Sequence, residues 1–274
     1  MTSKGFRFGV QATPRGGEQW LATAQQAEEL GYSTLLMPDG MQLLSPMPSL
    51  AIAAGATTTL RVGTFVLASP LRPPRQAAWD AHTLSVLTGG RFEFGIGTGR
   101  PEVAQQSVEL LGQPDTSLAQ HLARAGETID HLRELDGDLH TPVLMAAGGP
   151  RARAMAAAKA DIVTLATGPL ASRDEVARRA AEVRDAAGDR ADELEFAMPI
   201  FAIGDEVPPW MQQFLGADAA TLIARDSLMI LRGGTQQIAD ELRRRRDAIG
   251  VSYFSVNAAF CEQLAPVVDL LTGR

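Results

Sequence analysis

The chain is poor in the residues that build disulfides and metal sites. Its 274 residues include one cysteine, Cys261, and four histidines. A single cysteine cannot close an internal disulfide, and a lone thiol lacks the partners that a zinc site needs. We therefore interpret Cys261 as a small apolar residue that is buried in the last helix.

Basic residues are in the minority, and no stretch is apolar over a long distance. The 25 Lys and Arg residues against 32 Asp and Glu give a net charge of -7. This charge argues against nucleic acid as a partner, because nonspecific binding to phosphates depends on many cations. No apolar run approaches the roughly 20 residues of a membrane helix, so no membrane contact is expected. The opening MTSKGFRFGV has neither a secretory core nor an Arg-rich leader, which predicts a cytoplasmic protein.

One basic run, Arg243 to Arg246, is embedded among acidic residues. Asp240 and Glu241 precede the run at the i,i+4 spacing that allows ion pairs along a helix. We interpret the run as the solvated face of a helix rather than as a binding site for an anion.

Short apolar segments alternate with helical patterns along the whole chain. The predicted strands are residues 6–11, 33–37, 61–67, 91–96, 142–146, 161–165, 194–203 and 252–256. The predicted helices are residues 17–30, 48–58, 74–87, 101–111, 118–135, 151–159, 173–187, 235–249 and 262–271, with a helical insertion around 210–225. Alternation implies parallel pairing, and eight strands favour an α/β fold closed as a (β/α)8 TIM barrel over an open doubly wound sheet.

We expect one domain over residues 1–274, with insertions after the fourth and seventh strands. Barrels usually carry such insertions at the catalytic rim. Trp210, Phe214 and Met229 belong to the second insertion. Their spacing favours packing in the core, and a role in lining the substrate pocket is the alternative.

The passage HTLSVLTGGRFEFGIGTGR, residues 82–100, combines a helix, a stop and a strand. The helix ends at Gly89-Gly90, and the strand ends in Gly97-Thr98-Gly99. Because these glycines carry no side chain, we expect the turn to let the backbone approach a flat or phosphorylated ligand.

The ends of the strands supply the candidates for chemistry, because active sites of TIM barrels lie at the carboxyl ends of the strands. This criterion argues against a histidine triad or metal site, since His82, His121 and His131 fall in helices and His140 precedes a strand. The candidates that remain are Asp39, Ala68, Ser69, Arg72, Thr98, Arg100, Glu102, Gly148, Gly149, Pro150, Arg151, Thr167 and Gly168.

Three of these candidates have an ordinary structural alternative. The turn from Gly148 to Arg151 leads into a helix, whose free N–H groups and Arg151 would form an anion site, but many strand-to-helix turns have this composition. Asp39 lies in Pro-Asp-Gly, a common turn sequence. Glu102 is suited to stabilising the start of the helix that begins at Pro101.

Four segments together resemble a known family. They are LGYSTLLMPDG at residues 30–40, TTTLRVGTFVL at 57–67, LSVLTGGRFEFGIGTGR at 84–100 and AAGGPRARAMAAAKADIV at 146–163. The chain resembles the luciferase-like monooxygenase superfamily, in particular its coenzyme F420-dependent oxidoreductase branch. The resemblance implies a TIM barrel, a deazaflavin across the C-terminal mouth of the barrel, and a homodimer.

The resemblance also implies roles for individual residues. The cofactor phosphate is expected near Gly148, Gly149, Pro150 and Arg151, with Thr98, Thr167 and Gly168 nearby. Leu67, Ala68 and Ser69 are expected to form a bulge that contains a non-proline cis peptide bond and supports one face of the ring. Asp39 is expected to contact the ring or a proton in transit.

Two departures from the family pattern bear on the substrate. Relatives often have an Asp-His pair where this chain has Asp39-Gly40, and members that oxidise sugar phosphates have a glutamate at the position of Arg100. Oxidation of a sugar phosphate is therefore not expected. We predict that Arg100 places an anionic or carbonyl substrate and that Glu102 is the reserve acid.

The combined prediction is an oxidoreductase that transfers a hydride between C5 of coenzyme F420 and a small organic substrate. An FMN-dependent luciferase-like monooxygenase is one alternative, because both cofactors carry a phosphate at the same end. A noncatalytic protein that binds a flavin or deazaflavin is the other, suggested by the missing histidine.

Overall fold

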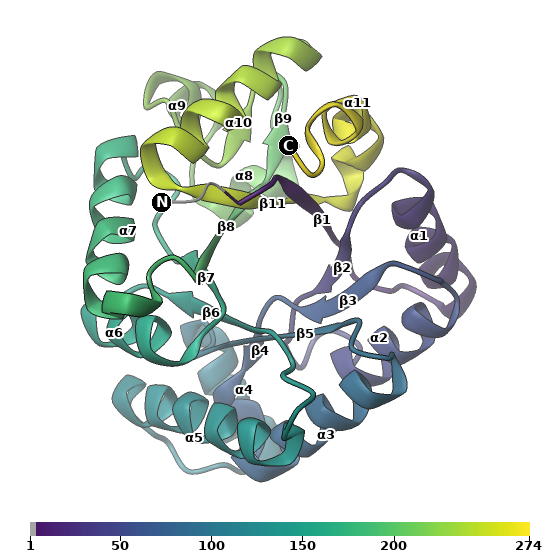
Figure 1. The fold of residues 1–274 in the computed structure, drawn as a ribbon, viewed down its shortest axis with the longest axis vertical. Helices are drawn as coiled ribbons and strands as arrows, with labels where there is room; N and C mark the ends of the chain where they lie inside the picture. The colour runs from purple at the N-terminus through teal and green to yellow at the C-terminus, as the bar shows by residue number, and fades with distance from the viewer. Residues whose placement is uncertain (1–3) are drawn as a thin grey trace.

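Eight parallel strands close into a barrel in the computed structural model, which describes residues 4–274 (Figure 1). In order around the barrel they are β1 (Arg7–Gln11), β2 (Thr34–Met37), β3 (Arg61–Thr64), β5 (Phe92–Gly97), β6 (Val143–Ala147), β7 (Ile162–Leu165), β8 (Glu195–Ile200) and β11 (Val251–Asn257). Pairing of β3 with β5 and of β11 with β1 completes the ring. The predicted TIM barrel is confirmed.

Helices surround the barrel on its outer side (Figure 1). They are α1 (Gly17–Glu29), α2 (Pro46–Gly55), α3 (Pro74–Leu87), α5 (Leu118–Asp136), α6 (Pro150–Lys159), α7 (Arg173–Ala187), α10 (Thr235–Ile249) and α11 (Cys261–Leu271). The bounds of α3, α7 and α10 are those predicted, and Cys261 is buried as expected. Among the described residues, no helix is long and apolar enough to cross a bilayer.

Extra elements follow the fourth and seventh strands of the barrel. α4 (Pro101–Leu111) lies between β5 and α5, whereas β9 (Ala202–Ile203), α8 (Pro209–Leu215), α9 (Ala219–Ala224) and β10 (Ile230–Leu231) lie between β8 and α10. β9 and β10 pair in a separate small sheet. The predicted single strand 194–203 was therefore wrong, since the barrel strand ends at Ile200. Short 3-10 turns, η2 (Gly188–Arg190) and η3 (Ala258–Phe260), follow α7 and β11.

An ion cluster fills the end of the barrel at which the strands begin. Arg7 pairs with Glu93 and with Glu195, both at 2.7 Å, and Arg61 pairs with Glu93 at 2.8 Å. The guanidinium carbon of Arg7 lies 3.5 Å from the centre of the Tyr253 ring. Burial lowers the pKa of Arg7, but Glu93 and its other neighbours outweigh burial and the pKa is raised, so Arg7 stays charged. The cluster links five strands through their side chains.

The predicted strand 61–67 is interrupted partway along its pairing with β5. The peptide bond between Phe65 and Val66 is cis, and pairing with β5 resumes only in β4 (Leu67–Ala68). The predicted position of the cis bond within Leu67, Ala68 and Ser69 was thus wrong, because the first two pair as a strand and Ser69 begins the 3-10 turn η1 (Ser69–Leu71). Phe65 and Val66 are the residues that leave the ladder, and they pack onto the apolar side chains inside the barrel.

Two glycines of β5 make room for the interrupted segment that lies beside them. A Cβ on Gly95 would lie 1.8 Å from the carbonyl oxygen of Thr64, and a Cβ on Gly97 would lie 2.9 Å from Cγ2 of Val66. The hydroxyl of Thr64 donates to the carbonyl oxygen of Gly95 at 2.6 Å. The side chain of Val66, in the segment between β3 and β4, therefore occupies the space beside Gly97.

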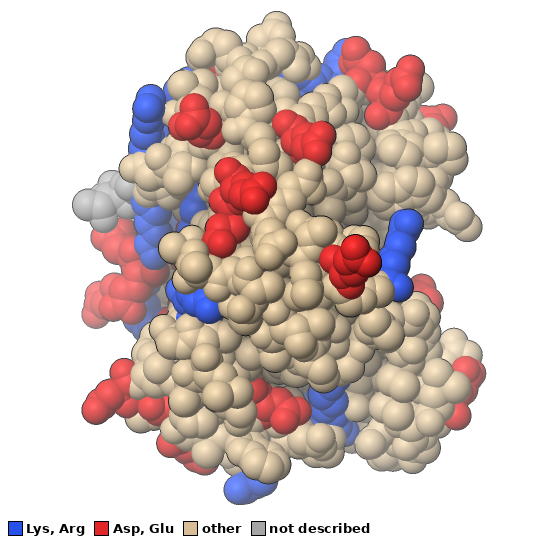
Figure 2. All heavy atoms as spheres, turned by 90° about the vertical axis from the view of Figure 1, so that its right-hand side faces the viewer, with Lys and Arg blue, Asp and Glu red and all other residues tan. Residues whose placement is uncertain are grey.

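The outer surface has one face with few charges. Figure 2 shows a broad area without charged side chains in the middle of the face over α1 and α2. α2 contains no charged residue, and its neighbour α3 exposes Trp79, Val86 and Leu87. Large exposed apolar side chains in adjacent helices are typical of contact surfaces.

Replacing Gly95 by alanine tests the close approach of β3 to β5. A methyl group there overlaps a backbone oxygen that has no freedom to move, so we expect Gly95→Ala to lower the free energy of unfolding by at least about 3 kcal/mol. Thermal and urea unfolding followed by circular dichroism would measure the effect. Gly17→Ala is the matched control, because a Cβ at Gly17 meets no atom within 4 Å. Equal stability of the two variants would contradict this account of β5.

Candidate active site

The predicted site residues leave the carboxyl ends of neighbouring strands. Asp39 follows β2, Leu67 to Arg72 lie in and after β4, Thr98, Arg100 and Glu102 follow β5, and the other candidates follow β6 and β7. Because all barrel strands are parallel, these segments emerge at one end of the barrel, opposite the ion cluster.

Asp39 forms a buried ion pair with Arg72. Its Oδ2 atom accepts from Nη1 of Arg72 at 2.5 Å and from the backbone N–H of Ala68 at 3.0 Å, and its Oδ1 atom accepts from Nη2 of Arg72 at 3.1 Å. Its side chain is 2% exposed. Both carboxylate oxygens are therefore occupied, and Asp39 holds the backbone that follows the cis peptide bond.

Helix α5 supports the same segment from the other side. Nη2 of Arg124 donates to the carbonyl oxygen of Arg72 at 2.9 Å, and the hydroxyl of Ser69 donates to the carbonyl oxygen of His121 at 2.8 Å. Burial, followed by the charge of Arg124, lowers the pKa of His121. A neutral His121 that bonds to Thr116 at 2.8 Å is a structural residue.

The other three histidines also have partners away from this end of the barrel. His82 bonds to Asp136 at 2.9 Å, His140 bonds to Asp161 at 2.9 Å, and His131 lies beside two glutamates of its own helix. Nothing in residues 4–274 groups three His, Cys, Asp or Glu side chains as a metal would require.

The start of α6 presents free backbone N–H groups. Gly149 precedes the helix, Pro150 is its first residue, and no side chain caps it, whereas Ser117 and Ser172 cap α5 and α7. A Cβ at Gly149 would meet no atom within 4 Å, so the approach is open. Arg151 is exposed and has no ion pair among the described residues. An uncapped helix start beside a free arginine fits a phosphate group.

Arg153 holds this turn in place from the next turn of the helix. Its Nη1 donates to the carbonyl oxygen of Gly148, and its Nη2 pairs with Glu182 at 2.6 Å. A Cβ on Gly148 would lie 3.4 Å from the carbonyl oxygen of Ala166, the residue before Thr167 and Gly168. The structure therefore brings the turns after β6 and β7 together, as the sequence analysis expected.

Arg100 and Phe214 connect the two insertions. The guanidinium carbon of Arg100 lies 4.6 Å from the centre of the Phe214 ring, although the residues follow the fourth and seventh barrel strands. Glu102 is exposed in the first turn of α4, and its carboxylate is 4.0 Å from Nε of Arg100. The spacing of Trp210, Phe214 and Met229 predicted core positions, but only Met229 is buried, and the other two side chains are exposed.

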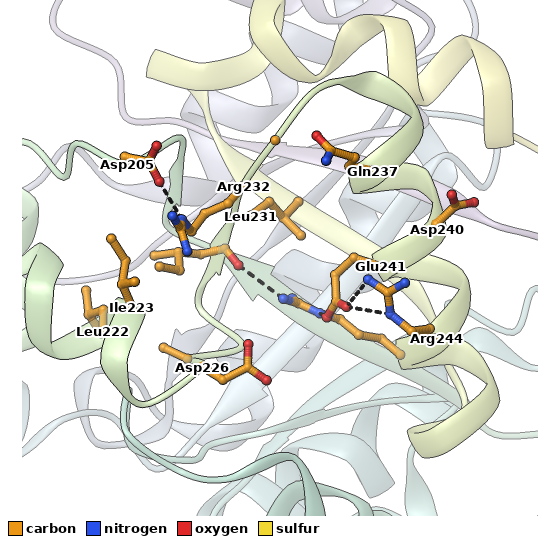
Figure 3. Close-up of a pocket in the computed structure, with 14 residues that line it drawn as sticks. Asp205, Leu222, Ile223, Asp226, Leu231, Arg232, Gln237, Asp240, Glu241 and Arg244 are labelled. Carbon is orange, nitrogen blue, oxygen red and sulfur yellow. Dashed lines mark hydrogen bonds and ion pairs between the residues drawn. The ribbon is translucent and has the colours of Figure 1, made fainter.

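A cavity of about 590 Å³ lies outside the barrel, between α9, β10 and α10 (Figure 3). Arg245 crosses beneath it and donates to the carbonyl oxygens of Leu228 and Ile230 at 2.7 and 3.1 Å. Burial alone would raise the pKa of Glu241, but hydrogen bonds from Arg173 and Arg245 hold it at about 2. The charged groups that line the cavity thus fasten the second insertion to α10, and no predicted site residue lines it.

The prediction that Arg243 to Arg246 form a solvated face was wrong for Arg245. Its side chain is 3% exposed. One of the carbonyl oxygens that it contacts belongs to Leu228, in the irregular segment before β10, and the other to Ile230, the first residue of β10. Arg243 and Arg244 are solvated and pair with Asp240 and Glu241, as a surface helix would have them.

Comparison with known proteins gives the family. The model of the luciferase-like monooxygenase family matches residues 6–208, and the chain belongs to this family. A Mycobacterium tuberculosis protein provisionally named a coenzyme F420-dependent oxidoreductase is 30% identical over 138 residues, which are 48% of this chain and 37% of that protein. The alignments span less than half the length of the curated relatives that the chain matches, at 47% for the uncharacterized Mycobacterium bovis protein.

Solved structures of related fold contain either of two cofactors. An F420-dependent secondary alcohol dehydrogenase in complex with an F420-acetone adduct superposes with a TM-score of 0.74 at 17% identity, covering 96% of this chain and 98% of that one. The oxygenating constituent of a 3,6-diketocamphane monooxygenase of Pseudomonas putida, in complex with FMN, has a TM-score of 0.68 at 14% identity and covers 96% and 95%. At these identities the likeness establishes the fold.

Breaking the Asp39–Arg72 pair separates a structural role from proton transfer. Removing one partner of a buried pair leaves the other charge unpaired, so we expect Asp39→Asn to cost about 3 kcal/mol of unfolding free energy. The double variant Asp39→Asn with Arg72→Met should lose less than the sum of the single variants, measured by urea unfolding. An Asp39→Asn protein of unchanged stability would contradict the structural role.

Proposed function

We propose that the protein is a cytoplasmic coenzyme F420-dependent oxidoreductase that acts on a small organic substrate. The observation that carries the proposal is the uncapped start of α6 beside Arg151, at the barrel end where the parallel strands finish. The family membership and the two F420-dependent proteins among the similar ones support it. When bound, F420 accepts or gives a hydride at C5.

The residues of this chain would bind and orient the cofactor. The N–H groups of α6 and the side chain of Arg151 hold the phosphate, with Gly148, Gly149, Thr167 and Gly168 shaping the turn around it. Phe65 and Val66, which are partly exposed, would face the ring, and the buried Leu67, Ala68 and Ser69 would support that face from behind them. Thr98 lies at the rim beside them.

The catalytic roles divide between a positioning residue and an exposed acid. Asp39, whose oxygens are occupied by Arg72 and Ala68, positions the ring support instead of donating a proton. Glu102 is exposed and near Arg100, so it is the acid with access to a substrate. Arg100 orients the substrate.

An FMN-dependent monooxygenase is the second candidate, because a protein of the same fold binds FMN. The start of α6 would accept the phosphate of either cofactor. The two candidates differ in the fate of oxygen, since only the monooxygenase consumes it when reduced FMN is supplied.

Cofactor titrations test the proposal. We expect F420 to bind with at least tenfold higher affinity than FMN, followed by the fluorescence of each cofactor. Arg151→Ala should weaken F420 binding about tenfold, the loss of one charged hydrogen bond, whereas Lys159→Ala at the other end of α6 should not. Tight FMN binding with oxygen consumption, and no binding of F420, would overturn the F420 assignment. Tight F420 binding without turnover of any alcohol, imine or enone would favour a noncatalytic binding protein.

We further propose that the protein is a homodimer that pairs through α2 and α3. Ile52 of α2 and Trp79, Val86 and Leu87 of α3 are exposed apolar side chains on two neighbouring helices. A tryptophan buries roughly 150–250 Å² when covered, and Trp79 is 65% exposed. α2 has no charged residue and α3 has Arg75 and Asp80, so a second copy of this mostly apolar face would match it in a two-fold contact.

Charge substitution tests this contact. We expect light scattering to give about twice the chain mass of 29.2 kDa for the natural protein, and one chain mass for Leu87→Glu. Leu118→Glu, at an exposed site near the start of α5, is the control and should remain dimeric. A natural protein that is monomeric at micromolar concentration would contradict the proposal.

A further inference from the structure

The guanidinium of Arg100 is exposed and lies over an aromatic ring. Its side chain is 60% exposed, and it stacks on Phe214 without a hydrogen-bond partner anywhere in residues 4–274. Glu102, at 4.0 Å from Nε, lies beyond hydrogen-bond distance. Arginine has five N–H donors around the edge of its plane, and stacking leaves this edge free.

Phe214 is itself held from behind. Its ring centre lies 5.4 Å from that of Phe201, at an interplanar angle of 47°. Phe201 follows β8, and its N–H donates to the carbonyl oxygen of Met229 at 2.8 Å. Phe214 therefore contacts both Phe201, which directly follows β8, and Arg100, and these contacts limit the orientations open to the guanidinium.

Apolar side chains are also exposed in other segments that leave the carboxyl ends of the strands. They come from the connections after three different strands, which meet at the same end of the barrel. The residues are Met41 and Leu44 after β2, Leu170 after β7, and Trp210 one helical turn before Phe214. Exposed apolar groups that gather at an active-site rim indicate a ligand with an apolar body.

We propose that Arg100, Phe214 and Trp210 form a specificity site for an apolar substrate that carries a carboxylate. The edge of the guanidinium binds the carboxylate through two parallel hydrogen bonds, and the two aromatic side chains contact the apolar body. The inference rests on the proposed function, because it names the substrate class of that oxidoreductase. The net charge of -7 repels anions from the surface as a whole, so selection for a carboxylate depends on this one arginine.

A pair of probes that differ only in charge tests the site. 4-Phenylbutyrate and 4-phenylbutanamide have the same apolar body, and their binding is measured by calorimetry without cofactor and again with F420 present. We expect the acid to bind at least tenfold more tightly than the amide. Arg100→Gln should abolish this difference while leaving the affinity for the amide unchanged, and Arg100→Lys should retain part of it. Phe214→Leu should weaken the binding of both probes.

Arg246→Gln is the matched control. Arg246 also stacks on a phenylalanine, at 4.0 Å from the ring centre of Phe6, but at the opposite end of the barrel. The control should bind both probes as the natural protein does. Thermal unfolding of every variant shows whether Arg100 only stabilises the contact between the two insertions. In that case Arg100→Gln lowers the melting temperature and leaves the preference for the acid intact.

The outcomes separate this inference from the proposed function. Equal binding of acid and amide, with normal F420 binding, would overturn the specificity site alone. Failure to bind F420, with the preference for the acid intact and dependent on Arg100, would overturn the F420 assignment alone. Persistence of the preference in Arg100→Gln would overturn the role of this arginine.

Discussion

The contact between Thr64 and Gly95 sets the geometry on which the site depends. At this point β3 passes so close to β5 that its carbonyl oxygen occupies the space of a side chain. After this contact, Phe65 and Val66 do not pair with β5 and pack instead on the apolar side chains inside the barrel. Pairing with β5 then resumes in β4. The ion pair of Asp39 and the hydrogen bonds from α5 hold the segment that follows the cis peptide bond. That segment can lie there only because Gly95 has no side chain.

The two ends of the barrel have opposite electrostatic character. Where the strands begin, Arg7 and Arg61 both pair with Glu93, and Arg7 also pairs with Glu195. Where the strands end, α6 has no cap, and the guanidinium groups of Arg100 and Arg151 have no hydrogen-bonded partner. This division agrees with the general property of TIM barrels, in which one end provides stability and the other provides chemistry.

The fold followed from the sequence because local signals agreed with each other. Proline and serine at the helix starts and glycine at the ends gave the bounds of α3 and α7, and the alternation of elements gave the barrel. The cis bond was misplaced by a residue or more, since only the register between β3 and β5 decides which residues leave the ladder. Arg245 was wrongly predicted to be solvated, because the helical pattern cannot show that backbone carbonyl oxygens of the second insertion pack against its side chain. The contact of Arg100 with Phe214 had no signal in the sequence, because it depends on how the second insertion folds back over the segment that follows β5.

The second insertion enters and leaves the barrel through paired strands. β9 and β10 run parallel, with Ile230 opposite Ala202, and Arg245 fixes the exit from below. The segment between them is thus tied to the rest of the chain at its two ends. The contact of Phe214 with Arg100 adds a third attachment, which joins the insertions that follow the fourth and seventh strands.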